Sequence, residues 1–248
     1  MIILKSRDEI ERMRRPSRIA AEVMAHLQEM VKPGVTTGEL DRIAEALIRN
    51  RSAKPAFKGY QGYQHALCVS VNEEVVHGIP GDRELKEGDI VGIDCGVFID
   101  DFYGDHAWTF TVGVVSDNAK KLLAATEDAL KKGIAATRLE NRLYDISAEI
   151  EDVAKAAGFS VVRDYVGHGI GRSLHEDPQI PNFGERGTGM KLRIGLVVAL
   201  EPMLNEGTHE VEVLKDGWTV VTKDRKLSAH MEHTVAIMEK GPEILSCL

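Results

Sequence analysis

The chain has 248 residues, of which 43% are hydrophobic and 28% are charged, a composition typical of a globular protein with a sizeable core and not of a disordered or membrane-embedded chain. Its 31 basic and 39 acidic residues give a formal net charge of -8, which argues against the broad cationic surface that non-specific nucleic-acid binding needs. The amino-terminal stretch is too charged for a signal peptide, no run is long enough to span a membrane, and the three cysteines lack paired or zinc-type spacing. We therefore expect a cytoplasmic protein without disulfides.

Two helices are predicted at the start of the chain. A capping-box pattern at Ser6–Glu9 begins a periodic, charged stretch that runs to Val31, with Pro16 near its first turns. The Lys-Pro-Gly stretch that follows ends this helix. A second capping box at Thr36–Glu39 begins another helix, in which apolar residues recur at helical spacing as far as Ile48.

The residue pattern of the following segments alternates between that of strands and that of helices. Residues 67–115 hold the short β-rich runs CVSVN, DIVGID, GVFI and HAWTFTVGVV, separated by Gly, Pro, Asn and Asp. Helices are predicted over Ser116–Lys132 and Tyr144–Ala157. The runs FSVVRDYVG, LVVALEP, GWTVVT and HTVAIM return to strand character.

This order of helices, strands, helices and strands predicts an α+β fold built from two similar halves. The runs GDIVGID at 88–94 and GLVVALE at 195–201 support a duplication, because each places a carboxylate after a glycine and an apolar strand. No Pro- or Ser-rich linker divides the chain, so we expect a single domain over residues 1–248.

Four carboxylates stand at predicted strand ends. Asp94 ends an apolar run and Asp105 begins the next long β run, so both could face the same end of one sheet. Taken singly, such an aspartate is more often a turn-forming or capping residue. Glu201 follows an apolar strand, where burial is costly unless a salt bridge or a bound cation compensates it. Glu232, taken alone, is more simply an exposed strand acid.

Two histidines lie in the stretch VGHGIGRSLHEDP at 166–178. Its glycines predict a shaped loop around His168, with His175 near its end. A phosphate-cradling loop is the alternative, but no clear helix opens at Gly171 and the third glycine of a dinucleotide fingerprint is missing. A single histidine is usually a structural residue, whereas two in one such loop make a functional site an equal alternative.

Together these residues form a donor set of carboxylates with one imidazole, namely Asp94, Asp105, His168, Glu201 and Glu232. The set suits paired divalent ions such as manganese, iron(II), cobalt(II) or zinc, because a structural zinc site would favour cysteine and magnesium rarely recruits histidine. Carboxylates gathered without cations would repel one another, which would raise some of their pKa values. Spacing alone does not show that the five residues converge.

Six ordered motifs resemble those of the bacterial type I methionine aminopeptidases, and the resemblance extends from Ser6 to Met238. They are VVHGIP at 75–80, VGIDCG at 91–96, YGDHAWTF at 103–110, GHGIGRSLHEDP at 167–178, ALEPM at 199–203 and DGWTVVTKDRKLSAHMEHT at 216–234. The resemblance implies the pita-bread fold, in which two pseudo-symmetric αβ halves with a curved antiparallel sheet surround a central dinuclear metal site.

The resemblance also assigns roles to single residues. It implies that Asp94, Asp105, His168, Glu201 and Glu232 bind two divalent metal ions, with Asp105 and Glu232 bridging them. Glu201 would pass a proton toward the leaving amine, while His77 and His175 would form hydrogen bonds at the developing tetrahedral centre. The activity implied is removal of the amino-terminal methionine from nascent proteins, with a preference for a small second residue.

A methionine pocket should be apolar, with aromatic or sulfur lining. The family positions are Phe57, Tyr60, Tyr63, Cys68, Leu174 and Trp218, with His77 and His175 at the reacting end. By themselves these aromatic residues read as core. The sequence departs from the family pattern at Phe57, Gln64 and Leu174, and we expect the preference for methionine to survive these exchanges.

The family also implies partners and subclass. The expected substrate is the nascent polypeptide, which implies transient proximity to the ribosome, and we expect a monomer with no stable nucleic-acid or membrane binding. The short segment between Glu201 and Glu232 leaves no room for the helical insertion of type II enzymes, and no zinc-binding extension precedes the catalytic part.

Three alternatives stay open at this point. Aminopeptidase P and prolidase share the fold and ligands but usually carry a further amino-terminal domain. An inactive relative used as a binding module would tend to lose ligands, whereas all five are present here. The third alternative is an acidic α+β protein with incidental polar clusters.

Overall fold

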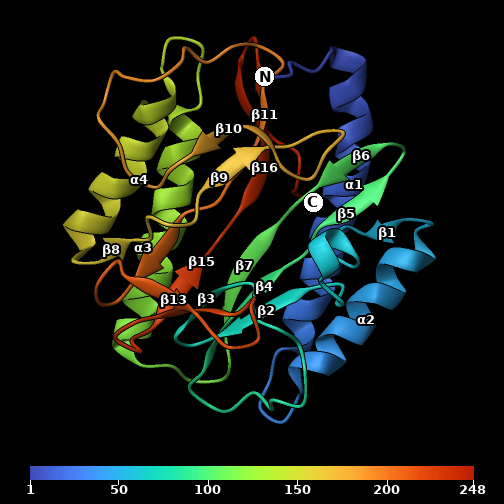
Figure 1. Ribbon diagram of the computed structural model, residues 1–248, viewed down its shortest axis with the longest axis vertical. Coiled ribbons are helices and arrows are strands. Elements are labelled where there is room, and N and C mark those ends of the chain that lie inside the picture. The colour runs from blue at the N-terminus through green and yellow to red at the C-terminus, as the bar shows by residue number, and fades with distance from the viewer.

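Each half of the chain begins with two helices that lie outside its strands, as Figure 1 shows for the computed structural model of residues 1–248. In the first half, α1 spans Arg7–Met30 and α2 spans Thr37–Asn50. The predicted capping box at the start of α1 is present, since the Ser6 hydroxyl accepts from the Glu9 amide and the Glu9 carboxylate accepts from the Ser6 amide.

Pro16 lies well inside α1 and not near its first turns, which corrects the predicted position. The adjoining backbone is closely covered by a strand, because a Cβ added at Gly104 would lie 2.3 Å from the Ser17 nitrogen. The glycine therefore lets the strand approach the helix at the place where proline leaves no amide to satisfy.

The second half repeats the pattern with α3 at Asp117–Ala136 and α4 at Leu143–Ala157. The third helix continues past the predicted end at Lys132, because Ile134 and Ala136 are buried in the core of this half. Gly158 ends α4 in the left-handed conformation, with φ of 83°, where glycine carries no steric penalty.

The strands are short and pair antiparallel throughout. Those of the first half are β1 (Lys54–Pro55), β2 (Cys68–Val71), β3 (Glu74–Val76), β4 (Ile90–Asp94), β5 (Val97–Ile99), β6 (Phe102–Gly104) and β7 (Ala107–Thr111), with a 3-10 turn at Tyr60–Gly62. Those of the second half are β8 (Ser160–Val161), β9 (Gly167–Gly169), β10 (Glu176–Ile180), β11 (Val197–Leu200), β12 (Met203–Asn205), β13 (Val211–Val213), β14 (Val220–Thr222), β15 (Ser228–His230), β16 (His233–Met238) and β17 (Gly241–Ile244).

Two sheets carry the centre of the molecule, one from each half. The first has the order β2-β4-β7 and packs on α1 and α2, while the second has the order β10-β9-β11-β16-β17 and packs on α3 and α4. Separate apolar clusters fill the two helix-sheet layers, with Leu27 and Ile93 in one and Leu130 and Val198 in the other. The predicted α+β fold with two similar halves is confirmed.

The halves are joined by main-chain contacts across the centre. Strand β14 of the second half pairs with β3 of the first, with Val220 opposite Val76. The Glu232 amide donates to the Ala107 carbonyl at 2.8 Å, which ties the start of β16 to β7. These contacts bring strand ends from both halves to one place.

No helix is both long and apolar enough to cross a membrane.

Candidate metal centre and its cavity

The first half contributes two aspartates from adjacent strands. Asp94 is the last residue of β4 and lies opposite Ala107, while Asp105 comes just before β7. The Asp105 main chain is anchored to the other half, because its amide donates to the Thr234 hydroxyl at 3.0 Å and its carbonyl accepts from that hydroxyl at 2.8 Å. Both carboxylates are therefore placed by strand pairing at the junction of the two halves.

His168 lies in a strand and not in a loop, which corrects the prediction for the glycine-rich stretch. Strand β9 runs between β10 and β11, with His168 opposite Ala199. Its glycines serve close packing, since a Cβ at Gly167 would lie 2.6 Å from the Ala199 carbonyl oxygen and one at Gly169 would lie 2.2 Å from the Asp177 carbonyl oxygen. The glycines next to His168 are needed for strand approach and not for a turn around it.

The His168 ring is oriented to offer a lone pair. Its Nδ1 donates to the Gly169 carbonyl at 2.9 Å, which leaves Nε2 as the free acceptor nitrogen. Burial lowers the pKa of His168 to about 3, so the ring is neutral at physiological pH. A neutral imidazole with one nitrogen held by the main chain is the usual form of a metal-binding histidine.

The two glutamates come from the second half. Glu201 directly follows β11, and its Oε1 lies 3.4 Å from Nε2 of His168. Glu232 precedes β16 and is only 2% exposed, so the interpretation as an exposed strand acid is wrong. The Glu232 carbonyl accepts from His106 Nδ1 at 2.6 Å. Because this bond and the bond from the Glu232 amide to Ala107 hold the main chain against the start of β7, the Glu232 carboxylate is buried.

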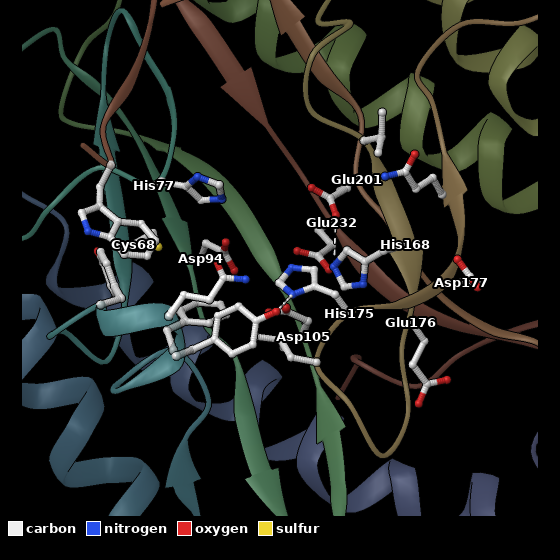
Figure 2. A pocket seen from close by; sticks show the side chains of 18 residues that line it. Cys68, His77, Asp94, Asp105, His168, His175, Glu176, Asp177, Glu201 and Glu232 are labelled. Atoms are coloured by element: carbon white, nitrogen blue, oxygen red, sulfur yellow. Dashed lines mark hydrogen bonds and ion pairs between the residues drawn. The ribbon is translucent and has the colours of Figure 1, made fainter. Parts of the chain in front are cut away.

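The predicted donors converge. Ligand atoms of Asp105, His168 and Glu232 all lie within 4.8 Å of one another. Figure 2 shows the carboxylates of Asp94 and Glu201 directed into the same space. Five residues from both halves of the chain thus form a single cluster, which sequence spacing alone did not establish.

The cluster holds more negative charge than the protein compensates. Burial and the neighbouring Asp105 and Glu201 raise the pKa of Asp94 well above its usual range, and burial followed by Asp105 does the same for Glu232. Burial raises the pKa of Glu201 well above its usual range. Burial and the nearby Glu201 carboxylate raise the pKa of Asp105 to about 7. Asp94 Oδ1 and Glu232 Oε1 are buried without any hydrogen-bond partner.

Divalent cations fit this arrangement. No lysine or arginine forms an ion pair with any of the four carboxylates, whose only basic neighbours within 4 Å are histidines. Oxygen donors with one imidazole suit manganese, iron(II), cobalt(II) or zinc, and an ion in the cluster would satisfy the two unpartnered oxygens. The residues present therefore match the metal that the donor chemistry predicts.

A cavity of about 660 Å³ opens beside the cluster. All the site residues predicted from the sequence line it: Phe57, Tyr60, Tyr63, Cys68, His77, Asp94, Asp105, His168, Leu174, His175, Glu201, Trp218 and Glu232. Gln64, one of the three departures from the family pattern, does not line the cavity. The lining also includes residues that the sequence analysis did not select: Gln61, Val166, Glu176, Asp177 and Gln179.

One end of the cavity is apolar and adjoins the metal cluster. Tyr63 packs edge-on against Trp218, with ring centroids 4.9 Å apart, and its hydroxyl lies 2.9 Å from the Leu67 carbonyl oxygen, to which it donates. Cys68 pairs with Asp94 across β2 and β4, so the apolar lining continues directly into the ligand set. An apolar side chain in this end would lie beside the metal cluster.

His77 and His175 lie at the cavity wall without joining the compact ligand group. His77 has a left-handed main chain, with φ of 59°, and its ring packs edge-on against Tyr165. His175 Nδ1 lies 2.8 Å from the Tyr60 hydroxyl, and its ring centroid lies 4.3 Å from that of His168. Burial lowers the pKa of His175, and burial chiefly lowers that of His77 to about 4, so both rings are neutral near pH 7.

Sequence reasoning missed several contacts that support these groups. Tyr60 is predicted only as pocket lining, yet its hydroxyl also holds His175. A buried ion pair between Lys5 and Glu176 anchors the loop that carries His175. Nothing local in the sequence joins these residues, because 171 positions separate Lys5 from Glu176.

The sequence matches the model of metallopeptidase family M24 over residues 11–239. A methionine aminopeptidase from Clostridium perfringens is 56% identical over 248 residues, with complete coverage of both chains. The crystal structure of methionine aminopeptidase from Thermotoga maritima superposes with a TM-score of 0.98 at 45% identity, again over the full length of both chains.

More distant structures share only the fold. The prolidase from Pyrococcus furiosus superposes with a TM-score of 0.79 at 23% identity, over 99% of this chain and 66% of its own. An identity this low carries no statement about activity. The remainder of the prolidase has no counterpart in the aligned residues.

Proposed function

The chain belongs to metallopeptidase family M24 and to its bacterial type I methionine aminopeptidases, with the pita-bread fold, and we propose how its residues remove an amino-terminal methionine. The observation that carries the proposal is the buried cluster of uncompensated carboxylates with a neutral His168 beside an apolar cavity. A site of this kind can hold dications and an apolar side chain next to each other.

We assign Asp94, Asp105, His168, Glu201 and Glu232 as the residues that would hold two divalent ions. Bound divalent ions lower the pKa of water and polarise a peptide carbonyl, which supplies hydrolysis at neutral pH. Support for two ions comes from the number of carboxylates, since a single dication would leave half of the negative charge of four carboxylates uncompensated.

The histidines of the cavity wall are placed to serve the reacting peptide bond. With Nδ1 engaged by the Tyr60 hydroxyl, His175 keeps Nε2 for a hydrogen bond to the substrate. His77 faces the cavity from the first half and supplies a second imidazole to the same bond. Glu201 also lines the cavity and passes a proton toward the leaving nitrogen.

The apolar end of the cavity takes the methionine side chain. Phe57, Tyr63, Cys68 and Trp218 supply rigid aromatic surface and one sulfur, which suit a flexible thioether. Leu174 closes the same cluster with an aliphatic side chain. We propose that methionine is preferred over leucine and phenylalanine, and that a small second residue is favoured.

We further propose the setting of the enzyme. Residues 1–248 act as one catalytic domain, because the ligands come from both halves. Nascent polypeptides are the substrates, which implies transient proximity to the ribosome. The enzyme is a cytoplasmic monomer that binds neither nucleic acid nor membrane stably. The net charge of -8 supports the absence of a broad nucleic-acid surface.

The test is a peptide panel with the purified protein. Chelated protein should be inactive, and activity should return on titration with Mn²⁺, Co²⁺, Fe²⁺ or Zn²⁺. Peptides that begin Met-Ala should be cleaved far faster than Leu-Ala, Phe-Ala or Met-Leu peptides, and X-Pro peptides should be poor substrates. Equal turnover of methionine, leucine and phenylalanine peptides would overturn the assigned specificity.

A further inference from the structure

His230 is a buried histidine next to the metal cluster. The proposed reaction does not use this histidine. Its side chain is 6% exposed, and its Nε2 lies 3.6 Å from Oε2 of Glu201. That nitrogen has no hydrogen-bond partner. A buried polar atom left without a partner is destabilising, which indicates that this nitrogen serves a group in the site.

The main chain of His230 is held in place from two sides. The His230 amide donates to the Thr109 hydroxyl at 3.0 Å, and that hydroxyl donates to the His230 carbonyl at 2.7 Å. Strand β15 also pairs His230 with Met203, two residues beyond Glu201. The ring therefore extends toward Glu201 from a backbone that has little freedom to move.

His230 contacts the metal cluster at Glu201. Glu201 lines the cavity, whereas His230 is absent from the cavity wall and from the compact donor group of Asp105, His168 and Glu232. The other oxygen of the Glu201 carboxylate lies 3.4 Å from Nε2 of His168. A dashed line marks this interaction in Figure 2. The carboxylate thus lies between two imidazoles, one that lines the cavity and one behind it.

We propose that His230 is a positioning residue: in the metal-loaded protein its Nε2–H, now 3.6 Å from Oε2 of Glu201, closes to hydrogen-bond distance and holds that carboxylate in its metal-binding orientation. Hydrogen bonds of this kind fix the orientation of metal-binding carboxylates, and their loss commonly weakens metal binding by about 10- to 100-fold. The inference rests on the proposed function, since it requires a metal at Glu201.

The test is metal affinity measured without reference to turnover. Isothermal titration of chelated protein with Mn²⁺ should give dissociation constants about 10- to 100-fold higher for His230→Leu and His230→Asn than for wild type. His230→Gln, which keeps an N–H donor of similar reach, should stay within about 3-fold of wild type. The asparagine variant keeps the test usable if the leucine variant does not fold.

A double variant separates positioning from general packing. If His230 acts through Glu201, then His230→Leu should change Mn²⁺ affinity less than 2-fold in a Glu201→Gln background. A merely structural histidine would instead lower the thermal midpoint of the chelated protein without moving metal affinity. Unchanged affinity in both the leucine and asparagine variants overturns the inference, as does an equal loss in the Glu201→Gln background.

Counting nitrogen ligands distinguishes a positioning residue from a metal ligand. Electron spin echo measurements on the Mn²⁺-loaded protein should show one coordinated imidazole, from His168, in wild type and in His230→Gln. Two coordinated imidazoles in wild type would overturn the inference by making His230 a ligand. If wild type binds no Mn²⁺ or other divalent ion, the proposed function itself fails. That result differs from one in which wild type binds Mn²⁺ and substitutions of His230 leave the affinity unchanged, which overturns only the role of His230.

Discussion

Two places in this molecule bury charged side chains, and they differ in how the charge is compensated. At the amino-terminal end, the side chains of Lys5 and Glu176 are 2% and 5% exposed and form an ion pair. The Glu176 carboxylate also accepts from the amides of Arg172 and Ser173 at 2.9 and 3.2 Å. In the metal cluster, by contrast, carboxylate oxygens of Asp94 and Glu232 have no partner.

The difference teaches what each site is for. A buried pair whose hydrogen bonds are all made within the chain is a structural element, and here it anchors the loop that carries Leu174 and His175. A buried carboxylate cluster without internal compensation must either take up protons or bind a cation from outside. The ion pair between Lys5 and Glu176 stabilises the fold. The carboxylate cluster instead lowers the stability of the metal-free fold and provides a binding site for cations.

The largest effect should come from removing a charge at the metal cluster. Asp105→Asn should lower kcat/KM by at least about 1,000-fold, because a catalytic metal stabilises transition-state charge by several kcal/mol. The same change should stabilise the chelated protein by about 1–3 kcal/mol, because it removes a buried charge that has no cationic partner in the protein. Peptidase assays and urea unfolding of chelated protein check both; an asparagine variant less stable than wild type would contradict the comparison.

The opposite sign is expected at the compensated pair. Lys5→Met should lower the free energy of unfolding by about 3–5 kcal/mol, because it leaves the Glu176 carboxylate buried and unpaired. Adding Glu176→Gln should recover part of this loss. The control is Arg7→Met, which breaks the exposed pair with Glu239 and should change the free energy of unfolding little, because water screens that pair. Equal losses in Lys5→Met and Arg7→Met would show that burial of the pair does not matter.

The stability of chelated protein should depend on pH because of the metal cluster. The folded-state pKa of Asp105 is raised from 3.8 to about 7, so the folded protein binds a proton that the unfolded chain has lost. Stability is therefore highest below pH 4 for this group, and about 2 kcal/mol or more should be lost as the pH rises from 4 to 7. Urea midpoints of the chelated Asp105→Asn variant, which lacks this group, should decline less over the same range.

The smallest effect is expected where the two regions meet, at His175. Tyr60→Phe removes one hydrogen bond from His175, so kcat/KM should fall by about 2- to 10-fold, which corresponds to 0.5–1.5 kcal/mol. Mn²⁺ affinity should not change, since Tyr60 touches no predicted ligand through its hydroxyl. Tyr144→Phe, in α4 away from the cavity, is the matched control. A change in Mn²⁺ affinity in Tyr60→Phe would place Tyr60 in the ligand support instead.

Much of the site was predictable because it depends on residue types in ordered motifs. The sequence predicted the donor chemistry of Asp94, Asp105, His168, Glu201 and Glu232 and, through the family resemblance, the lining of the cavity. It also predicted where the first helix begins, because the capping box at Ser6 depends only on neighbours along the chain.

The sequence by itself therefore determined the local starts of helices, the α+β order and the kind of atoms available to a metal. Tertiary structure alone decided that His168 lies in a strand, that Glu232 is buried, and that Lys5 meets Glu176 across 171 positions. The physical reason is that capping and periodicity act between near neighbours in the chain, whereas desolvation and charge pairing depend on which distant segments pack together.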